Sequence, residues 1–109
     1  MVDIDFSNKV SVFKALSDET RLKIVAMLSP DEEMCACEIL KHFNVTQPTL
    51  SYHMKILTDC DLVDGRRDGA WMKYRINSRS YMELQTFLAN LIPELSDADS
   101  DRRYEAILK

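Results

Sequence analysis

Hydrophobic residues in the first half of the chain recur at the spacing of short amphipathic helices. The pattern predicts one helix over residues 7–16 and a second that follows an N-cap at Ser17 and ends before Pro30. The buried stripe expected for this second helix is Leu22, Val25, Ala26 and Leu28. A third helix is predicted over about residues 35–43, and a fourth follows the N-cap Thr46.

The pattern then changes from helical to alternating. It predicts strands over residues 62–67 and 70–76, joined at Asp68-Gly69, because an Asp-Gly pair tolerates the positive φ of a two-residue hairpin turn. A long helix is predicted over about residues 80–95, and a short one after residue 97. Hydrophobic residues wrap more than one face of the long helix, so one face would pack on the domain and another on a second subunit. They are Met82, Leu84, Phe87, Leu88, Leu91, Ile92 and Leu95.

Short helices, a tight turn and a hairpin, in that order, are typical of a winged helix-turn-helix. We therefore expect a mainly α fold with a small β-hairpin wing. Residues 1–109 would form a single winged helix-turn-helix DNA-binding domain whose terminal helices make a homodimer. The fourth helix would be the recognition helix, with Leu50, Met54 and Leu57 on its core face.

The opposite face of that helix carries side chains that can reach base edges and phosphates in a major groove. They are Gln47, Thr49, Ser51, Tyr52 and Lys55. In the wing, Arg66, Arg67 and Lys73 suit phosphates or a narrow minor groove. The alternatives are a merely solvated helix face and a charged strand edge that discourages aggregation. Trp71 and Tyr74 are expected to be packing residues.

The net charge of -4 argues against DNA binding until its distribution is considered. Residues 41–79 carry 7 basic and 4 acidic side chains, whereas both flanking segments are acidic. Because the local field governs docking on phosphates, the basic centre favours double-stranded DNA as the partner. No apolar run is long enough for a membrane helix and the N-terminus does not resemble a signal peptide, so we expect a cytoplasmic protein with no membrane partner.

The chemically informative segment is Cys35-Ala36-Cys37. Thiolates prefer soft ions, so this pair favours arsenite, antimonite, cadmium or lead over magnesium or calcium. Residues two apart lie about 200° apart on an ideal helix, so the two sulfurs would meet one ion only if the first turn of the third helix unwinds. That distortion would move the recognition helix. Cys60 is expected to be a core residue and is a less favoured third ligand.

Three stretches together resemble the ArsR/SmtB family of metal-responsive repressors: FKALSDETRLKIVAML, TQPTLSYHMKILTDCDLV and GRRDGAWMKYRIN. The resemblance covers roughly residues 10–80 and implies a homodimer, a palindromic operator and repression relieved by an inducer. The segment MCACE resembles the thiol motif of the family's arsenite sensors, although Leu40 stands where the best-known form has a third cysteine. This implies arsenite or antimonite as inducer, with cadmium or lead as further candidates, and no cofactor for DNA binding.

Two other functions stay open. One is a DNA-binding repressor gated by thiol oxidation, and the other is a dimeric interaction module that does not bind DNA. An enzyme is not expected, because the sequence offers no nucleophile–base arrangement and no phosphate-binding glycine loop.

Overall fold

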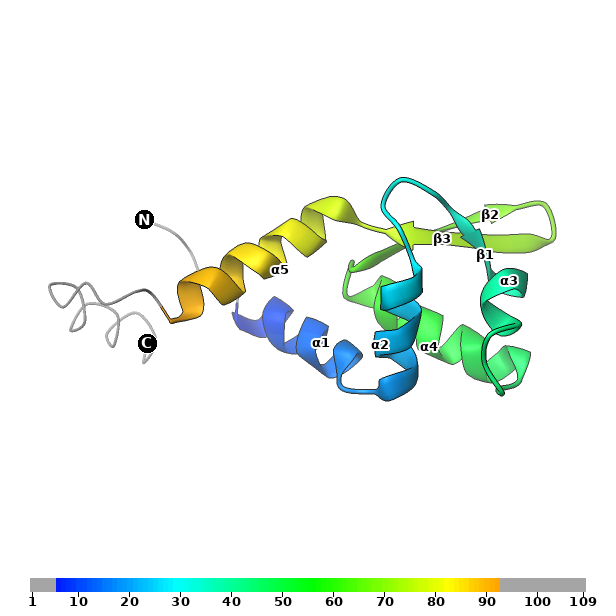
Figure 1. The fold of residues 1–109 in the computed structure, drawn as a ribbon, viewed down its shortest axis with the longest axis horizontal. Coiled ribbons are helices and arrows are strands. Elements are labelled where there is room, and N and C mark those ends of the chain that lie inside the picture. The colour runs from blue at the N-terminus through cyan, green and yellow to red at the C-terminus, as the bar shows by residue number, and fades with distance from the viewer. Residues whose placement is uncertain (1–5, 93–109) are drawn as a thin grey trace, which may run out of the picture.

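The computed structural model describes residues 6–92, which form helices at both ends and a small sheet between them. Figure 1 shows α1 and α5 at one end of the molecule and the β2–β3 hairpin at the other. The helices are α1 (Phe6–Leu16), α2 (Glu19–Met27), α3 (Ala36–Leu40), α4 (Gln47–Asp59) and α5 (Ser78–Leu91). The strands are β1 (Met34–Cys35), β2 (Val63–Asp68) and β3 (Trp71–Ile76). The expected mainly helical fold with a hairpin wing is confirmed; the short helix predicted after residue 97 lies outside the described residues.

The sheet is antiparallel, with the strand order β1-β3-β2. Its first strand, only two residues long, was not expected from the sequence. The β2–β3 turn differs from the prediction by one residue, because Asp68 pairs with Trp71 and leaves Gly69 and Ala70 as the loop. Only Gly69 of this pair has a positive φ, 63°, which matches the turn class with glycine at the first loop position.

Gly65 in β2 permits a close approach by the ring of Tyr74, its partner in β3. A Cβ atom at Gly65 would lie 2.9 Å from Cε1 of Tyr74. Tyr74 is itself buried in the core, so the expectation that it is a packing residue is confirmed. The absence of a side chain at Gly65 therefore leaves room for the Tyr74 ring on this face of the sheet.

Capping side chains set the starts of the helices. Asp18, and not Ser17, caps α2: its carboxylate accepts from the Arg21 N–H at 3.0 Å, whereas the Ser17 hydroxyl donates to the Lys14 carbonyl at 2.7 Å. The prediction of Ser17 was wrong because two adjacent polar residues both suit the position. Thr46 caps α4 as predicted.

One helix boundary and the buried residues of one helix also differ from the prediction. Helix α5 starts at Ser78, after the cap Asn77, two residues before the predicted start. In α2 the fully buried residue is Ile24, while Leu22 and Ala26 are exposed. Leu22 is two positions from Ile24, which places it about 200° around the helix and away from the core.

One hydrophobic core joins the helices to the sheet. Its fully buried side chains include Ile24 of α2, Ile39 of α3, Met54 and Leu57 of α4, and Leu62 and Val63 at the start of the hairpin. Both α3 and α4 thus pack on the centre that also holds the wing. Within residues 6–92, no helix has the length and apolarity that crossing a membrane requires.

Candidate DNA-binding surface and thiol site

The predicted DNA-binding residues of α4 lie on the solvent-facing side of this helix. Leu50, Met54 and Leu57 are buried, as predicted, and this turns the opposite face of the helix to solvent. The exposed side chains are Gln47, Thr49, Ser51, Tyr52 and Lys55. The surface is therefore polar, nearly continuous and available to a large ligand.

Two of these side chains already have partners inside the helix. The Thr46 hydroxyl donates to the Thr49 hydroxyl at 3.0 Å, as part of the N-terminal cap. Lys55 forms an exposed ion pair with Asp59, with Nζ to Oδ2 at 3.0 Å. Gln47, Ser51 and Tyr52 have no such hydrogen bond in the described part of the chain and so offer their polar atoms outward.

The β2–β3 hairpin, here called the wing, carries three predicted DNA-binding cations, and two of them are ion-paired. Arg66 donates from both Nε and Nη2 to the carboxylate of Glu33, each at 2.7 Å in its shorter bond. Lys73 pairs with Asp68 at 3.0 Å, and this ammonium lowers the pKa of the Asp68 carboxyl. Arg67 is exposed and has no carboxylate within ion-pair distance among residues 6–92.

An open groove runs between α4 and the wing, with a volume of about 340 Å³. We call it the α4–wing groove. Gln47 and Ser51 line it from α4, and Arg67 and Trp71 line it from the wing. The remaining lining residues are Ala36, Cys37, Leu40, Leu50, Met54, Ala70, Met72 and Tyr74. The groove thus has polar residues on both lips and a thiol residue in its wall.

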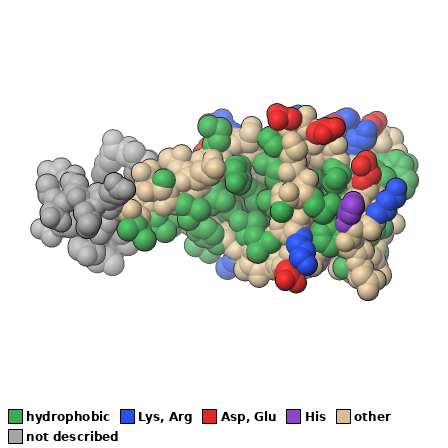
Figure 2. All heavy atoms as spheres, viewed as in Figure 1, with side chains coloured by type: hydrophobic (Ala, Val, Ile, Leu, Met, Phe, Trp, Pro, Cys, Tyr) green, Lys and Arg blue, Asp and Glu red, His purple; other side chains and the backbone are tan. Residues whose placement is uncertain are grey.

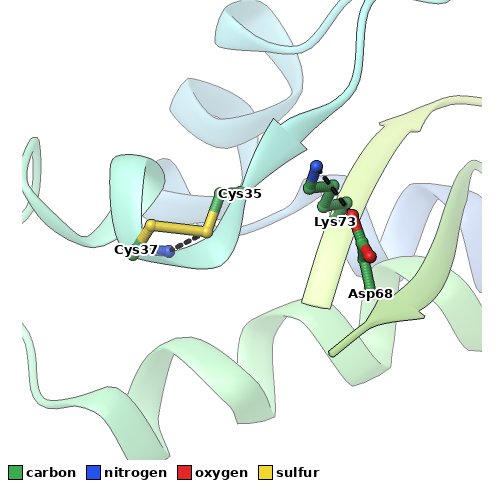
Figure 3. The surroundings of a disulfide bond; sticks show 4 residues. All are labelled: Cys35, Cys37, Asp68 and Lys73. Atoms are coloured by element: carbon green, nitrogen blue, oxygen red, sulfur yellow. Dashed lines mark hydrogen bonds and ion pairs between the residues drawn. A yellow bond between two sulfur atoms is a disulfide. The ribbon is translucent and has the colours of Figure 1, made fainter. Parts of the chain in front are cut away.

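The structure joins Cys35 and Cys37 in a disulfide at the start of α3 (Figure 3). Cys35 is the N-cap and not a helical residue: its φ and ψ are -66° and 142°, and its Sγ accepts from the Cys37 N–H at 3.2 Å. The expectation that the sulfurs stay apart on a helix was therefore wrong. The extended backbone of Cys35 brings the two sulfurs together without any unwinding of α3.

The thiol pair is attached to the wing as well as to α3. Strand β1 pairs with β3, and this pairing places Cys35 opposite Lys73. Figure 3 shows the Lys73 side chain between Cys35 and Asp68. Sequence reasoning assigned Lys73 to DNA and missed this neighbourhood, because a two-residue strand leaves no periodic signal.

Cys60 lies apart from this pair, in the hydrophobic core at the C-terminal end of α4. The residue is 7% exposed, and its thiol donates to the Leu57 carbonyl at 3.4 Å. Burial raises the pKa of the Cys60 thiol. The expectation of a core residue is confirmed, and the described residues contain no cluster of three or more His, Cys, Asp or Glu side chains that could hold a metal.

Arg21 connects three helices. Its Nε donates to the Ala15 carbonyl of α1 at 2.6 Å, and its Nη1 lies 3.0 Å from Nδ1 of His53 in α4. This contact fixes the orientation of α4 relative to α1.

Helices α1 and α5 together expose an apolar face. Phe87 of α5 contacts Phe6 and Phe13 of α1, with ring centroids 5.9 and 6.1 Å apart. Figure 2 shows hydrophobic side chains over these two helices. The exposed large hydrophobic residues are Phe6, Val10, Phe13, Tyr81, Met82, Leu88, Leu91 and Ile92. An apolar face of this kind is typical of an interface.

Residues 18–64 match the profile of a family described as bacterial regulatory protein, arsR family. The arsenical resistance operon repressor of Staphylococcus aureus is 49% identical over 67 residues, which are 62% of this chain and 64% of that repressor. The chain therefore spans less than two thirds of that relative's length. The transcriptional repressor SdpR of Bacillus subtilis is 34% identical over 75% of this chain and 90% of its own length.

The fold also matches solved structures. A homodimeric winged helix-turn-helix DNA-binding domain from Mycobacterium bovis, described as a possible ArsR-family transcriptional regulator, superimposes with a TM-score of 0.63. It is 26% identical, and the match covers 79% of each chain.

Proposed function

Because the chain belongs to the ArsR family of bacterial regulatory proteins, we propose that it is a cytoplasmic transcriptional repressor that binds a palindromic operator as a homodimer. Arsenite or antimonite at Cys35 and Cys37 releases it from the operator, and cadmium and lead are further candidate inducers. The observation that carries the proposal is the meeting of the two sulfurs at the junction of β1 and α3. This junction adjoins both elements that would contact DNA.

The DNA-binding part of the proposal is supported by the exposed face of α4 and by the wing. Gln47 and Ser51 would read base edges, whereas Arg66, Arg67 and Lys73 would supply phosphate or minor-groove attraction. Thr49, Tyr52 and Lys55 lie on the same exposed side of α4 and would add contacts to the backbone. Relatives that are named as repressors support repression as the outcome of DNA binding.

The dimer is supported by the apolar face of α1 and α5 and by the homodimeric neighbour. A two-fold axis at these helices would present two copies of α4, and operator half-sites would lie about one DNA turn apart. A palindrome is the DNA sequence that matches this symmetry.

Induction begins with the reduced pair, which a cellular thiol regenerates from the disulfide. Arsenous acid then exchanges two hydroxyl groups for the sulfurs of Cys35 and Cys37, forming two As–S bonds and releasing two waters. Water-derived hydroxide or a cellular thiol holds the third position, since the described residues place no third thiol there. Two sulfurs bridged by an arsenic atom lie farther apart than two sulfurs bonded to each other. Arsenic would therefore push Cys37 away from Cys35 and strain the start of α3.

Thiol oxidation is the second candidate for the signal, and the Cys35–Cys37 disulfide favours it. With a peroxide as oxidant, the two thiols become the disulfide and hydrogen peroxide becomes two waters. Both signals act on the same two sulfurs. The two proposals nevertheless predict different operator affinities for the oxidised protein. Under the arsenite proposal, operator release needs the metalloid; under the redox proposal, peroxide alone suffices.

The deciding experiment is a gel shift with the DNA immediately upstream of the gene. Reduced protein should retard this duplex, and arsenite or antimonite should release it at concentrations that leave the Cys35→Ser/Cys37→Ser double variant bound. Parallel lanes with cadmium, lead, zinc and hydrogen peroxide separate the other signals. A wild-type protein that never retards the duplex would contradict the repressor proposal and leave the interaction module as the better account.

A further inference from the structure

The wing is less cationic in the fold than in the sequence. Arg66 is held by Glu33, and Lys73 is held by Asp68, so each of these charges has a nearby carboxylate. Arg67 is the predicted wing cation without such a partner in the described part of the chain. Electrostatic attraction from the wing tip is therefore weaker than a count of its basic residues indicates, which leaves room for a contact of another kind.

Trp71 is placed to make that contact. It is the first residue of β3, directly after the Gly69-Ala70 loop, and 51% of its surface is exposed although it was expected to pack. It lines the α4–wing groove on the same side as Arg67, facing Gln47 and Ser51 across the opening. An exposed indole has a large apolar surface and a polar N–H group, and this combination suits a residue at an interface.

We propose that Trp71 is a DNA-contacting residue whose indole ring packs against the operator. One DNA strand would cross the α4–wing groove, with the indole against a deoxyribose or a base edge and Arg67 on a neighbouring phosphate. This inference rests on the proposed function and adds a salt-independent contact to it. Apolar side chains that contact the minor groove, and aromatic rings that pack on nucleotides, both supply binding energy without charge.

The occupant of the groove is argued from the chemistry of its lips. Amide and hydroxyl groups from α4 suit base edges and phosphate oxygens, and the guanidinium of Arg67 suits a phosphate. A nucleotide strand offers a phosphate, a sugar and a base in series. The phosphate would match Arg67, the sugar would match the ring of Trp71, and the base would match the polar groups of α4. A purely apolar partner would leave Gln47, Ser51 and Arg67 without complements.

The first test uses intrinsic fluorescence, because the chain contains a single tryptophan. Reduced protein is titrated with the upstream duplex, and emission and acrylamide quenching are recorded beside a gel shift of the same samples. Trp71 emission should shift or be quenched, and acrylamide access should fall, in parallel with the bound fraction. Retardation without any change in emission or quenching would overturn the inference while leaving the repressor proposal intact.

The second test compares salt dependence among variants. Trp71→Ala should weaken operator binding roughly tenfold, as for loss of one aromatic contact with a nucleotide, and leave the slope of log K against log salt unchanged. Trp71→Phe should recover part of the affinity. Arg67→Ala should instead reduce that slope by about one, because it removes one phosphate contact.

Leu22→Ala is the matched control, since Leu22 is an exposed apolar residue of α2 outside the groove, at 50% exposure. It should bind as the wild type does. Thermal unfolding and sedimentation check that each variant is folded and has the wild-type mass. Unchanged affinity in a folded Trp71→Ala protein would overturn the inference, and a wild type that binds no duplex would overturn it together with the proposed function.

Discussion

Arg66 in the wing and Glu33, the residue before β1, form a bidentate ion pair although 33 positions separate them. Hydrogen bonds from Arg66 lower the pKa of the Glu33 carboxyl, and the carboxylate raises the pKa of the guanidinium in return. The pair thus ties the wing to the segment that leads into Cys35. An operator phosphate would have to compete with Glu33 for the same guanidinium.

Replacing Glu33 tests that competition. Glu33→Gln should raise operator affinity and steepen the slope of log K against log salt by about one, because Arg66 becomes available for a phosphate. The melting temperature should change little, since exposed ion pairs contribute little stability. Fluorescence anisotropy at several salt concentrations gives the slope. If Glu33→Gln raises affinity equally in an Arg66→Ala background, the gain does not come through Arg66.

The cysteine variants separate sensing from DNA binding. Cys35→Ser and Cys37→Ser should both retard operator DNA and stay bound in arsenite, because each removes one of the two As–S bonds. Cys60→Ser should respond as the wild type does, with somewhat lower stability because a hydroxyl replaces a thiol in the core. Loss of induction in Cys60→Ser would point instead to a three-thiol site, built across subunits or after a rearrangement.

The two glycines of the wing should respond differently to substitution by alanine. Gly65→Ala should cost about 1–3 kcal/mol, because its Cβ would meet the buried Tyr74 ring at 2.9 Å. Gly69→Ala meets no atom within 4 Å and should suffer only from the positive φ, at about 1–2 kcal/mol. Gly69→Asn, which tolerates that φ, should recover most of the loss, whereas Gly65→Asn should recover nothing. Urea unfolding measures all four.

A charge on the exposed face of α5 should disrupt the dimer. Leu88→Asp should lower the mass seen by sedimentation equilibrium and weaken operator binding in the same protein, because a carboxylate would be buried at the interface. Asn90→Asp adds a charge at an exposed polar position about 200° around the same helix from Leu88 and serves as the control. A Leu88→Asp protein that remains dimeric would move the interface away from this face.

The cap of α2 gives a pH dependence. The Arg21 N–H lowers the pKa of Asp18 below the model-compound value of 3.8. A carboxyl group with a lowered folded-state pKa stabilises the fold above its unfolded pKa, and this contribution is lost as the pH falls through the folded value. Melting temperatures of the wild type and Asp18→Asn should therefore converge below pH 3.8 and separate above it.

Local patterns predicted the elements that depend on neighbours in sequence. Thr46 as a cap and the stripe of Leu50, Met54 and Leu57 follow from spacings of three and four residues, and both are confirmed. The position of Cys35 opposite Lys73, in contrast, depends on the pairing of a two-residue strand with a distant hairpin. The Glu33–Arg66 pair is likewise tertiary, and no periodicity in the sequence indicates it.

The sequence predicted where the basic residues lie better than it predicted which side chains are exposed. It identified the basic wing, but the fold decided that Arg66 and Lys73 are paired and that Trp71 is open to solvent. Burial at the end of a hairpin depends on how far the turn extends beyond the helices. The exposure of Trp71 is therefore a property of the folded hairpin, and no local pattern in the sequence indicates it.

Cys35 belongs to two elements at once, as the last residue of β1 and as the N-cap of α3. A single backbone conformation, with ψ at 142°, satisfies the ladder on one side and the first turn of the helix on the other. Any ligand that rotates this residue toward helical values would detach the strand and uncap the helix in the same movement. The wing and α3 are therefore coupled through the backbone of Cys35, so a ligand that changes its conformation would act on both at once.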